Sequence, residues 1–346
     1  MKIGLLVRMI VVILLASALG SLSCRKEEKK SPVSVGTRTV YVVNEDDDTV
    51  SVIDGIAKTL IASIPVGKWP HYIALDPAGK RVYVTNGESN NISVIDTATH
   101  RVVSTIEDIY SDPQQIAIHP AGRFAYVPCY DTADLHVVDL TQGRINVSIH
   151  VGEGAHSIAL SSDGRRVYVV SLRDPQAMVI DTTINKVVAT FTVGEGACGI
   201  AVSLDGGRIY LGGHGVGMWM GKGEKNMDIR VIDARTFKQL SLIRCGIMPI
   251  AVKLSCDGKQ TYVVSHGNGE LHIIDNVNNK TTSVKVGKDC RDLAGTMDGK
   301  WVYVTNRGDN TVSVVDVSAK KVVASVRVGK GPVGIALNES TNIGSH

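Results

Sequence analysis

Four histidines stand at corresponding points of a repeated pattern and are the first candidates for chemistry. They are His71, His156, His214 and His266. Neutral imidazole is a common metal ligand, so four such rings on one face would suit a metal ion or a haem iron. None of them has the close ligand spacing of a metal motif. The alternative is that they are surface or channel histidines that make ordinary hydrogen bonds.

Three arginines, Arg173, Arg291 and Arg307, fall near the same points of the pattern. A guanidinium group can hold a carboxylate or an anionic cofactor through two parallel hydrogen bonds. Alternatively, each arginine pairs with an acidic neighbour in sequence, and these neighbours are Asp174, Asp292 and Asp309.

Several classes of chemistry are excluded by missing motifs. The chain lacks a Cys-x-x-Cys-His sequence, so we expect no covalently bound haem. It also lacks a Gly-Lys-Ser/Thr phosphate loop and a Gly-x-Ser-x-Gly nucleophile elbow. With a net charge of +3 and only short basic runs, it does not look like a nucleic-acid-binding protein.

The elements that position these residues are repeated strand pairs. Residues 80–86 alternate apolar and other side chains, and residues 91–96 form an apolar run that stops at Asp96, so the two segments predict a β-hairpin. The pattern occurs seven times, with Tyr and Asp as markers: Tyr41/Asp54, Tyr83/Asp96, Tyr126/Asp139, Tyr168/Asp181, Tyr210/Asp233, Tyr262/Asp275 and Tyr303/Asp316.

A second marker gives the period of the repeat. Its positions are Pro70, Pro113, Ala155, Ala197, Pro249, Cys290 and Pro332. All intervals are 41 to 43 residues except one of 52, a period typical of four-stranded propeller blades. Residues 39–54 lack an inner strand, and residues 331–337 supply one. We therefore predict an all-β, seven-bladed β-propeller over residues 39–338, closed by a mixed N- and C-terminal blade.

The Tyr-Val-Thr-Asn segments at 83–86 and 303–306 resemble the YVTN family of seven-bladed β-propellers, and the resemblance covers about residues 39–338. In propellers, the loops before the inner strand and after the Tyr strand emerge on one face around the central channel. The resemblance therefore places the histidines and arginines at one channel mouth. It says little about function, because propellers host many roles.

The clearest departure from the repeat is a Gly-rich insertion at residues 212–227, which accounts for the interval of 52. It contains the apolar cluster Met218, Trp219 and Met220, and exposed Trp and Met are typical of interface anchors. We interpret the cluster as a partner contact. A lid over a ligand and an insertion without function are the alternatives.

The N-terminal residues 1–23 have the charged start, apolar middle and small-residue end of a secretory signal. Cys24 follows as in a bacterial lipobox, although Ser21 stands where Leu is usual. We expect export to the periplasm or an equivalent compartment. The pattern leaves open whether Cys24 is lipidated, and a lipid there would be the only membrane attachment. Residues 24–38 then form a charged tether, and residues 339–346 a C-terminal tail. An uncleaved membrane anchor is the alternative, which Arg8 disfavours.

Besides Cys24, the chain has five cysteines, and they are Cys129, Cys198, Cys245, Cys256 and Cys290. In an exported protein they could form one or two disulfides. Equally, they could be small buried residues at unrelated repeat positions.

Taken together, these features predict a non-catalytic propeller subunit that scaffolds or gates a redox enzyme, with any haem on partner chains. In size, blade number and lack of haem sites the chain resembles the β subunits of hydrazine synthases, the anammox enzymes that make hydrazine from nitric oxide and ammonium. That resemblance implies haem-bearing partner subunits and location in the anammoxosome. The alternatives are a stand-alone protein that binds a modified haem or a small anion at the channel mouth, and a surface interaction module.

Overall fold

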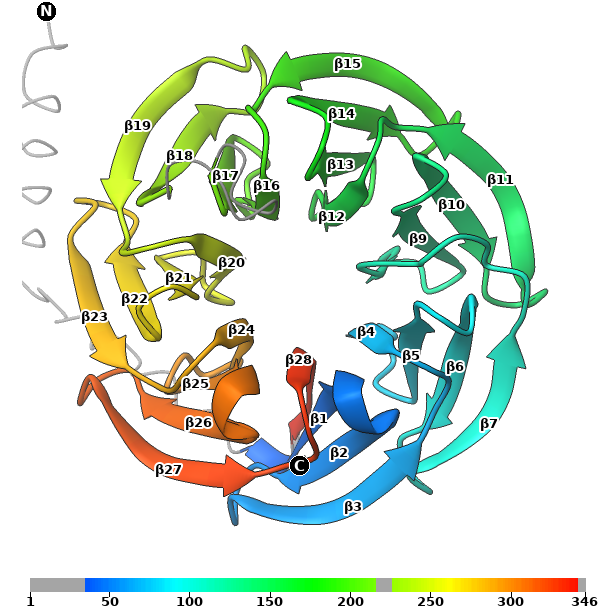
Figure 1. Cartoon of the computed structure of the whole chain (residues 1–346). Helices are drawn as coiled ribbons and strands as arrows, with labels where there is room; N and C mark the ends of the chain where they lie inside the picture. Colours follow the sequence, from blue (N-terminus) through cyan, green and yellow to red (C-terminus); the bar gives the residue numbers. More distant parts are fainter. Residues whose placement is uncertain (1–34, 216–225, 342–346) are drawn as a thin grey trace, which may run out of the picture. The chain divides into compact units, whose positions relative to one another are not determined.

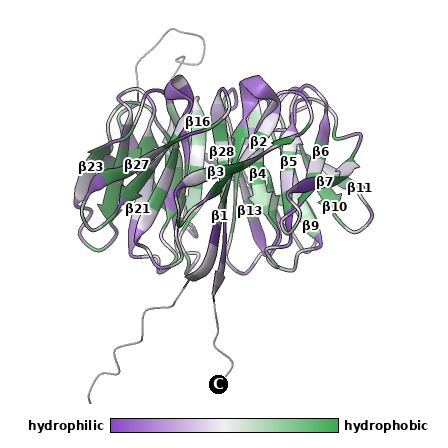
Figure 2. Cartoon of the chain, turned by 90° about the horizontal axis from the view of Figure 1, so that it is seen from below, coloured by the Kyte–Doolittle hydropathy of each residue, from purple (hydrophilic) through white to green (hydrophobic). Residues whose placement is uncertain are grey.

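The computed structural model describes residues 35–215 and 226–341, and in these residues the strands form seven four-stranded antiparallel sheets. Figure 1 shows the sheets as the blades of a ring, each with one strand next to the centre and one at the rim. This confirms the predicted seven-bladed β-propeller. Figure 2 shows hydrophobic colouring along the strands and hydrophilic colouring in the loops on both rims.

The blades are numbered 1 to 7 along the chain. Blade 1 contains β28 (Pro332–Thr341), β1 (Val35–Asn44), β2 (Thr49–Asp54) and β3 (Thr59–Pro65). Blade 2 contains β4 (Pro70–Leu75), β5 (Arg81–Asn86), β6 (Asn91–Asp96) and β7 (Arg101–Ile106). Blade 3 contains β8 (Ala117–Ile118), β9 (Phe124–Cys129), β10 (Asp134–Asp139) and β11 (Arg144–His150). Blade 4 contains β12 (Ala155–Leu160), β13 (Arg166–Ser171), β14 (Gln176–Asp181) and β15 (Lys186–Thr192).

Blade 5 contains β16 (Ala197–Val202), β17 (Arg208–Gly213), β18 (Asp228–Asp233) and β19 (Gln239–Arg244). Blade 6 contains β20 (Pro249–Leu254), β21 (Gln260–Ser265), β22 (Glu270–Asp275) and β23 (Thr281–Lys285). Blade 7 contains β24 (Cys290–Gly295), β25 (Trp301–Asn306), β26 (Thr311–Asp316) and β27 (Lys321–Arg327). Two short 3-10 helices follow β1 and β25, namely η1 (Glu45–Asp47) and η3 (Arg307–Asp309).

Blade 1 joins the two ends of the described chain. β1 and β28 pair antiparallel from Val35 opposite Thr341 to Asn44 opposite Pro332, as the mixed blade predicts. The pairing extends beyond the expected limits of 39 and 338 at both ends. Part of the expected tether and tail therefore belongs to the sheet, because each extra residue continues the same ladder of backbone hydrogen bonds.

The Asn that ends the Tyr strand has a clear structural role in three blades. The side-chain amide of Asn306 donates to Thr311 Oγ1 at 3.1 Å and to Ser313 Oγ at 2.9 Å, and Asn44 and Asn86 make equivalent bonds in their own blades. Gly287 makes room for Asn306, since a Cβ at that glycine would collide with the amide. Gly67 and Gly329 face Asn86 and Asn44 in the same way, so the glycine and the asparagine of the repeat fit each other.

The Asp that ends each third strand closes the next turn. In all seven blades its Oδ1 accepts a backbone N–H two or three residues later, as Asp54 does from Ile56. Asx turns of this kind stop a strand and reverse the chain.

The tyrosines of the repeat pack between blades. Tyr303 of β25 lies among Val40, Val42 and Ile53 of blade 1, and its hydroxyl donates to the carbonyl of Gly55 at 2.8 Å. Full burial of a Val or Ile side chain contributes about 1.5–3 kcal/mol, so each seam between blades adds strongly to stability.

The five cysteines are all free, so no disulfide links the described residues. The expectation of one or two disulfides is therefore wrong for them. Four are buried and Cys256 is exposed. Burial raises the pKa of Cys198, Cys245 and Cys290 to about 12, which keeps these side chains as thiols.

The predicted signal segment 1–23 and Cys24 lie outside the described residues, and so does the cluster Met218, Trp219 and Met220. Within 35–215 and 226–341, no helix has both the length and the apolar character needed to cross a membrane.

We predict that Asn306→Ala lowers the free energy of unfolding by about 1–3 kcal/mol, because the hydroxyls of Thr311 and Ser313 lose a buried partner. Ser171 occupies the same repeat position in blade 4, and its buried hydroxyl has no partner among the described residues. Ser171→Ala is therefore the matched control and should be nearly neutral. Chemical denaturation of the two variants checks this, and equal losses would contradict the role given to the Asn.

Candidate functional site

Residues at or just before the starts of the seven inner strands line a small central cavity of ≈160 Å³. Every blade contributes the residue that follows its Pro position: His71, Gln114, His156, Cys198, Ile250, Arg291 and Val333. Glu45, Tyr72, His214 and Asp292 complete the lining. The repeat position thus determines which side chains meet here, and the lining is mainly polar.

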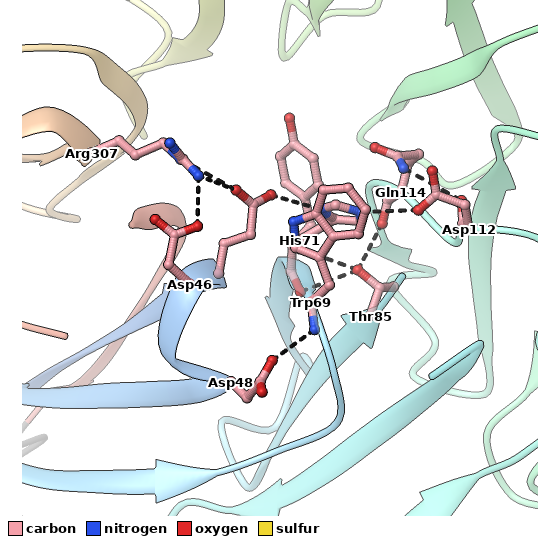
Figure 3. Close-up of polar contacts among 10 residues, drawn as sticks. Asp46, Asp48, Trp69, His71, Thr85, Asp112, Gln114 and Arg307 are labelled. Carbon is pink, nitrogen blue, oxygen red and sulfur yellow. Dashed lines mark hydrogen bonds and ion pairs between the residues drawn. The ribbon is translucent and has the colours of Figure 1, made fainter. Parts of the chain in front are cut away.

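His71 is held between two carboxylates (Figure 3). Its Nδ1 lies 3.0 Å from Glu45 Oε1, and its Nε2 lies 2.9 Å from Asp112 Oδ1. Burial alone would lower the pKa of His71, but the hydrogen bonds and charges of Asp112 and Glu45 outweigh it and raise the pKa to about 9. The ring is therefore an imidazolium at neutral pH, and neither nitrogen is available to a metal. The indole of Trp69 lies tilted beside it, 5.4 Å between ring centroids.

Arg307 extends this network into blade 7. Its Nη2 lies 2.9 Å from Glu45 Oε2 and 2.7 Å from Asp46 Oδ1 (Figure 3). The alternative pairing with Asp309 is wrong, because η1 of blade 1 brings two carboxylates closer, while Asp309 accepts the backbone N–H of Lys288. We call Arg307, Glu45, His71 and Asp112 the mouth clasp, and it joins blades 7, 1 and 2 to the loop before blade 3.

That loop holds Asp112 in an unusual backbone conformation. Asp108, Ser111 and Asp112 all have left-handed φ angles, of 60°, 71° and 57°. Residues other than glycine adopt such angles at some cost, and they cluster at functional sites. Here the conformation brings the Asp112 carboxylate to His71.

His156 is neutral, and its tautomer is set by its neighbours. Ser157 Oγ lies 2.6 Å from the carbonyl oxygen of Cys198, so the single hydroxyl hydrogen is donated there. The same Oγ lies 2.8 Å from His156 Nδ1 and must accept that hydrogen bond. Burial, with the charges of His214 and His71, lowers the pKa of His156 to about 3. The Nε2 atom of His156 therefore carries no hydrogen and presents a lone pair.

His214 and His266 pack edge to face, with 6.2 Å between ring centroids. Burial, followed by the charges of His266 and Arg291, lowers the pKa of His214 to about 4. His266 does not line the central cavity, and its Nδ1 lies 2.7 Å from Asp289 Oδ1.

Arg291 pairs with Asp289, since its Nε lies 2.7 Å from Asp289 Oδ1. The alternative pairing with Asp292 is wrong, because Asp292 Oδ2 accepts the backbone N–H of Ile335 at 3.3 Å. The 2.7 Å contacts of Asp289 Oδ1 are ion pairs that lack the alignment of hydrogen bonds. Burial would raise the pKa of Asp289, but the close contact with His266 and the charge of Arg291 lower it overall.

Asp292 and Tyr72 add two more titratable groups to the cavity. Burial raises the pKa of the Asp292 carboxyl, and its nearest cationic group is Lys253 Nζ at 3.8 Å. Burial also raises the pKa of Tyr72, so its hydroxyl stays protonated and can donate.

Arg173 lies elsewhere on this face. Its guanidinium stacks on the ring of Tyr130 at 4.7 Å, and it does not line the cavity. The structure therefore brings His71, His156, His214 and Arg291 together, and it leaves Arg173, His266 and Arg307 around them.

A haem does not fit the central cavity. Pockets for ligands of drug size or larger span about 300–1,000 Å³, well above the ≈160 Å³ found here. Among the described residues, no group of three or more His, Cys, Asp or Glu side chains is arranged to hold a metal ion. The central cavity therefore suits a small ion or molecule, and the alternative of a modified haem elsewhere at the mouth stays a prediction.

Two wider grooves lie further out. One, of ≈810 Å³, borders the ends of the Gly-rich insertion and includes Arg230 and Arg244. The other, of ≈670 Å³, lies between blades 2 and 3 and includes Trp69, Tyr110 and Asp112. Trp69 is 50% and Tyr110 58% exposed, and no other Trp, Tyr or Phe in the described residues is as exposed.

Comparison with known proteins supports the fold. Residues 10–134 match the model of the YNCE-like beta-propeller family, and residues 223–330 match that of the cytochrome D1 heme domain. A search of curated proteins finds no match. The chain is a seven-bladed β-propeller.

Two solved structures illustrate the similarity. One is a chain of hydrazine synthase from Kuenenia stuttgartiensis, with a TM-score of 0.74 and 19% identity over 86% of this chain and 99% of that one. The other is a functionally unknown protein from Desulfotomaculum acetoxidans DSM 771, with a TM-score of 0.70 and 15% identity over 86% and 98% of the two chains. At these identities the structural similarity shows the fold alone. The first of these structures agrees with the resemblance to hydrazine synthase in size and blade number that the sequence indicated.

Sequence reasoning missed three residues of the site, namely Glu45, Tyr72 and Asp112, and it considered Asp292 only as a partner of Arg291. Tyr72 and Asp292 directly follow His71 and Arg291, so the repeat alignment could have found them. Glu45 and Asp112 carry no local signal, because each acts on a residue of another blade.

The mouth clasp should make stability depend on pH. The pKa of His71 rises from about 6.5 unfolded to about 9 folded, so the clasp contributes fully below about pH 6.5 and is lost as pH rises through about 9. We predict a loss on the order of 2–3 kcal/mol between these limits in the native protein, and a flatter profile in His71→Gln.

Denaturation at a series of pH values checks this, with His150→Gln as the control because its side chain is 76% exposed. An NMR titration of His71 gives the pKa directly. A midpoint near 6.5 for His71 would contradict the clasp.

Proposed function

We propose that this chain is an exported propeller subunit without a covalent cofactor of its own, which scaffolds or gates a multi-subunit redox enzyme whose haems lie on partner chains. Hydrazine synthase is the specific assembly that we favour. The similarity to its chain supports this, because it extends over 99% of that chain and hence over the whole ring.

The observation that carries the proposal is the position of the two exposed aromatic rings. Trp69 and Tyr110 line one groove on the face that bears the central cavity. Trp and Tyr are enriched among the residues that dominate binding energy at protein interfaces. Because both rings line the same groove, they offer a partner one combined aromatic contact.

The charges around the groove indicate the chemistry of the partner. Glu88, Asp112 and Asp131 line it with the aromatic rings, so its rim is acidic. Electrostatic complementarity at interfaces favours partner surfaces of the opposite sign. We therefore infer that the haem-bearing chain presents a basic surface around an apolar contact.

Export and lipidation belong to the same proposal. A periplasmic-type redox assembly requires a secreted subunit, and the segment before Cys24 has the pattern of a secretory signal. The Met218, Trp219 and Met220 cluster, which lies outside the described residues, stays a predicted second contact.

The docking face can be tested by purifying the tagged full-length chain from its source cells. We predict that haem-bearing chains co-purify at fixed stoichiometry with the native protein, and that Trp69→Ala combined with Tyr110→Ala reduces their yield at least tenfold. This corresponds to the loss of about 1.4 kcal/mol or more, typical of interface aromatics.

Leu60→Ala with Ile61→Ala is the matched control, because these side chains are 46% and 53% exposed on the outer strand β3. A cooperative thermal unfolding transition close to that of the native protein shows that both double variants fold. A chain that purifies alone and colourless would contradict the proposal, and so would equal yields from the two double variants.

The mature N-terminus tests export independently. Mass spectrometry of the native protein should find Cys24 as the first residue, carrying a diacylglycerol. Cys24→Ser should release the protein from the membrane fraction, since a lipid is then absent. An intact Met1 in the native protein would contradict cleavage before Cys24 and favour the uncleaved anchor.

A further inference from the structure

We propose that the central cavity is a binding site for a small monovalent oxyanion that carries a hydroxyl hydrogen, held by Arg291 and oriented by His156. This site is independent of partner docking, because it rests on side chains inside the ring. It names a ligand class for a cavity whose size excludes haem.

Arg291 supplies the charge. One edge of its guanidinium faces Asp289, through Nε at 2.7 Å and Nη2 at 3.3 Å. Its Nη1 has no partner among the described residues, and the side chain is 33% exposed while lining the cavity. Arginine is suited to oxyanions because its planar group offers several donors in a fixed geometry.

His156 supplies an acceptor. Its Nδ1 hydrogen is committed to Ser157 Oγ, since the Ser157 hydroxyl is itself donated to the carbonyl of Cys198. Nε2 is then the ring nitrogen left for a ligand, and it carries a lone pair. A neutral imidazole with this tautomer can accept a hydrogen from the ligand but cannot donate one through Nε2.

The neighbouring groups fit the same ligand. The Tyr72 hydroxyl is protonated and has no partner among the described residues, so it can donate to a second oxygen of the anion. Burial lowers the pKa of His156 most, and the charges of His214, His71 and Arg291 lower it further against the opposing charge of Asp112. The ring therefore stays neutral beside the cationic Arg291 and His71.

The lining also limits the charge and size of the ligand. Glu45 and Asp292 also line the cavity, and their carboxyl groups disfavour a multiply charged anion such as phosphate. A volume of ≈160 Å³ suits a group of about four to six heavy atoms. Hydrogencarbonate and a short hydroxy acid such as glycolate share this chemistry.

Two matched pairs of anions test the proposal on the full-length protein by isothermal titration calorimetry near neutral pH. Hydrogencarbonate and nitrate have similar shape and charge, but only hydrogencarbonate has an O–H. Glycolate and acetate form the second pair. At least one hydroxylated anion should bind about tenfold more tightly than its partner, the magnitude of about one hydrogen bond. The pair in which the hydroxylated anion binds more tightly shows whether the site takes hydrogencarbonate or a short hydroxy acid.

Three variants assign the roles. Arg291→Met should weaken binding at least tenfold, while Arg123→Met, whose guanidinium pairs with Asp139 away from the cavity, should not change it. Ser157→Ala removes the hydroxyl that keeps the hydrogen of His156 on Nδ1, so the ring can adopt either tautomer. The two anions of each pair should then bind with similar affinities. If a thermal melt shows that Arg291→Met is unfolded, the titrations of Ser157→Ala and of the native protein still test the proposed site.

Absence of binding by all four anions up to about 50 mM would overturn the site, since that is weaker than any useful affinity for a small ion. Equal affinities within both pairs for the native protein would overturn it as well. So would unchanged binding in a folded Arg291→Met variant.

Discussion

The antiparallel pairing of β1 with β28 is the constraint on which the rest of the propeller depends. It supplies blade 1 with its inner strand and brings η1 next to blade 7. Glu45 of η1 can then accept from both His71 and Arg307. A propeller blade cannot bury its two faces alone, so closing the ring also completes the seams between neighbours.

Closure also decides what the channel mouth can do. The inner strands bring one side chain from each blade to a cavity of ≈160 Å³. In this small space, the environment gives each histidine a different state: His71 is a cation locked between carboxylates, while His156 and His214 are neutral. The same residue type therefore provides a structural clasp at one point and a free acceptor at another.

Much of the fold could be predicted from sequence because its determinants are local and repeated. The Asp that ends each third strand and the Asn after the Tyr strand act on residues two to seven positions away, so their spacing is visible in the chain. The period and the missing inner strand of residues 39–54 then gave the number of blades and the mode of closure.

The site was harder to predict because its contacts join different blades. The sequence pointed to His71, but its partners Glu45 and Asp112 are 26 and 41 residues away. The alternative that paired Arg307 with Asp309 failed for the same reason, since its partner Glu45 comes from another blade. Arg291 does pair with a sequence neighbour, but with Asp289 rather than Asp292. The loop at Asp112 depends on left-handed backbone angles that residues other than glycine rarely signal.

A cryo-electron microscopy structure of the native assembly, purified through the full-length chain, would test the proposed role most directly. The expected result is a haem-bearing subunit seated on the channel-mouth face, with Trp69 and Tyr110 buried in the contact. A partner bound only to the outer strands or to the opposite face would contradict the docking role, and a particle that contains this chain alone would contradict the subunit role altogether.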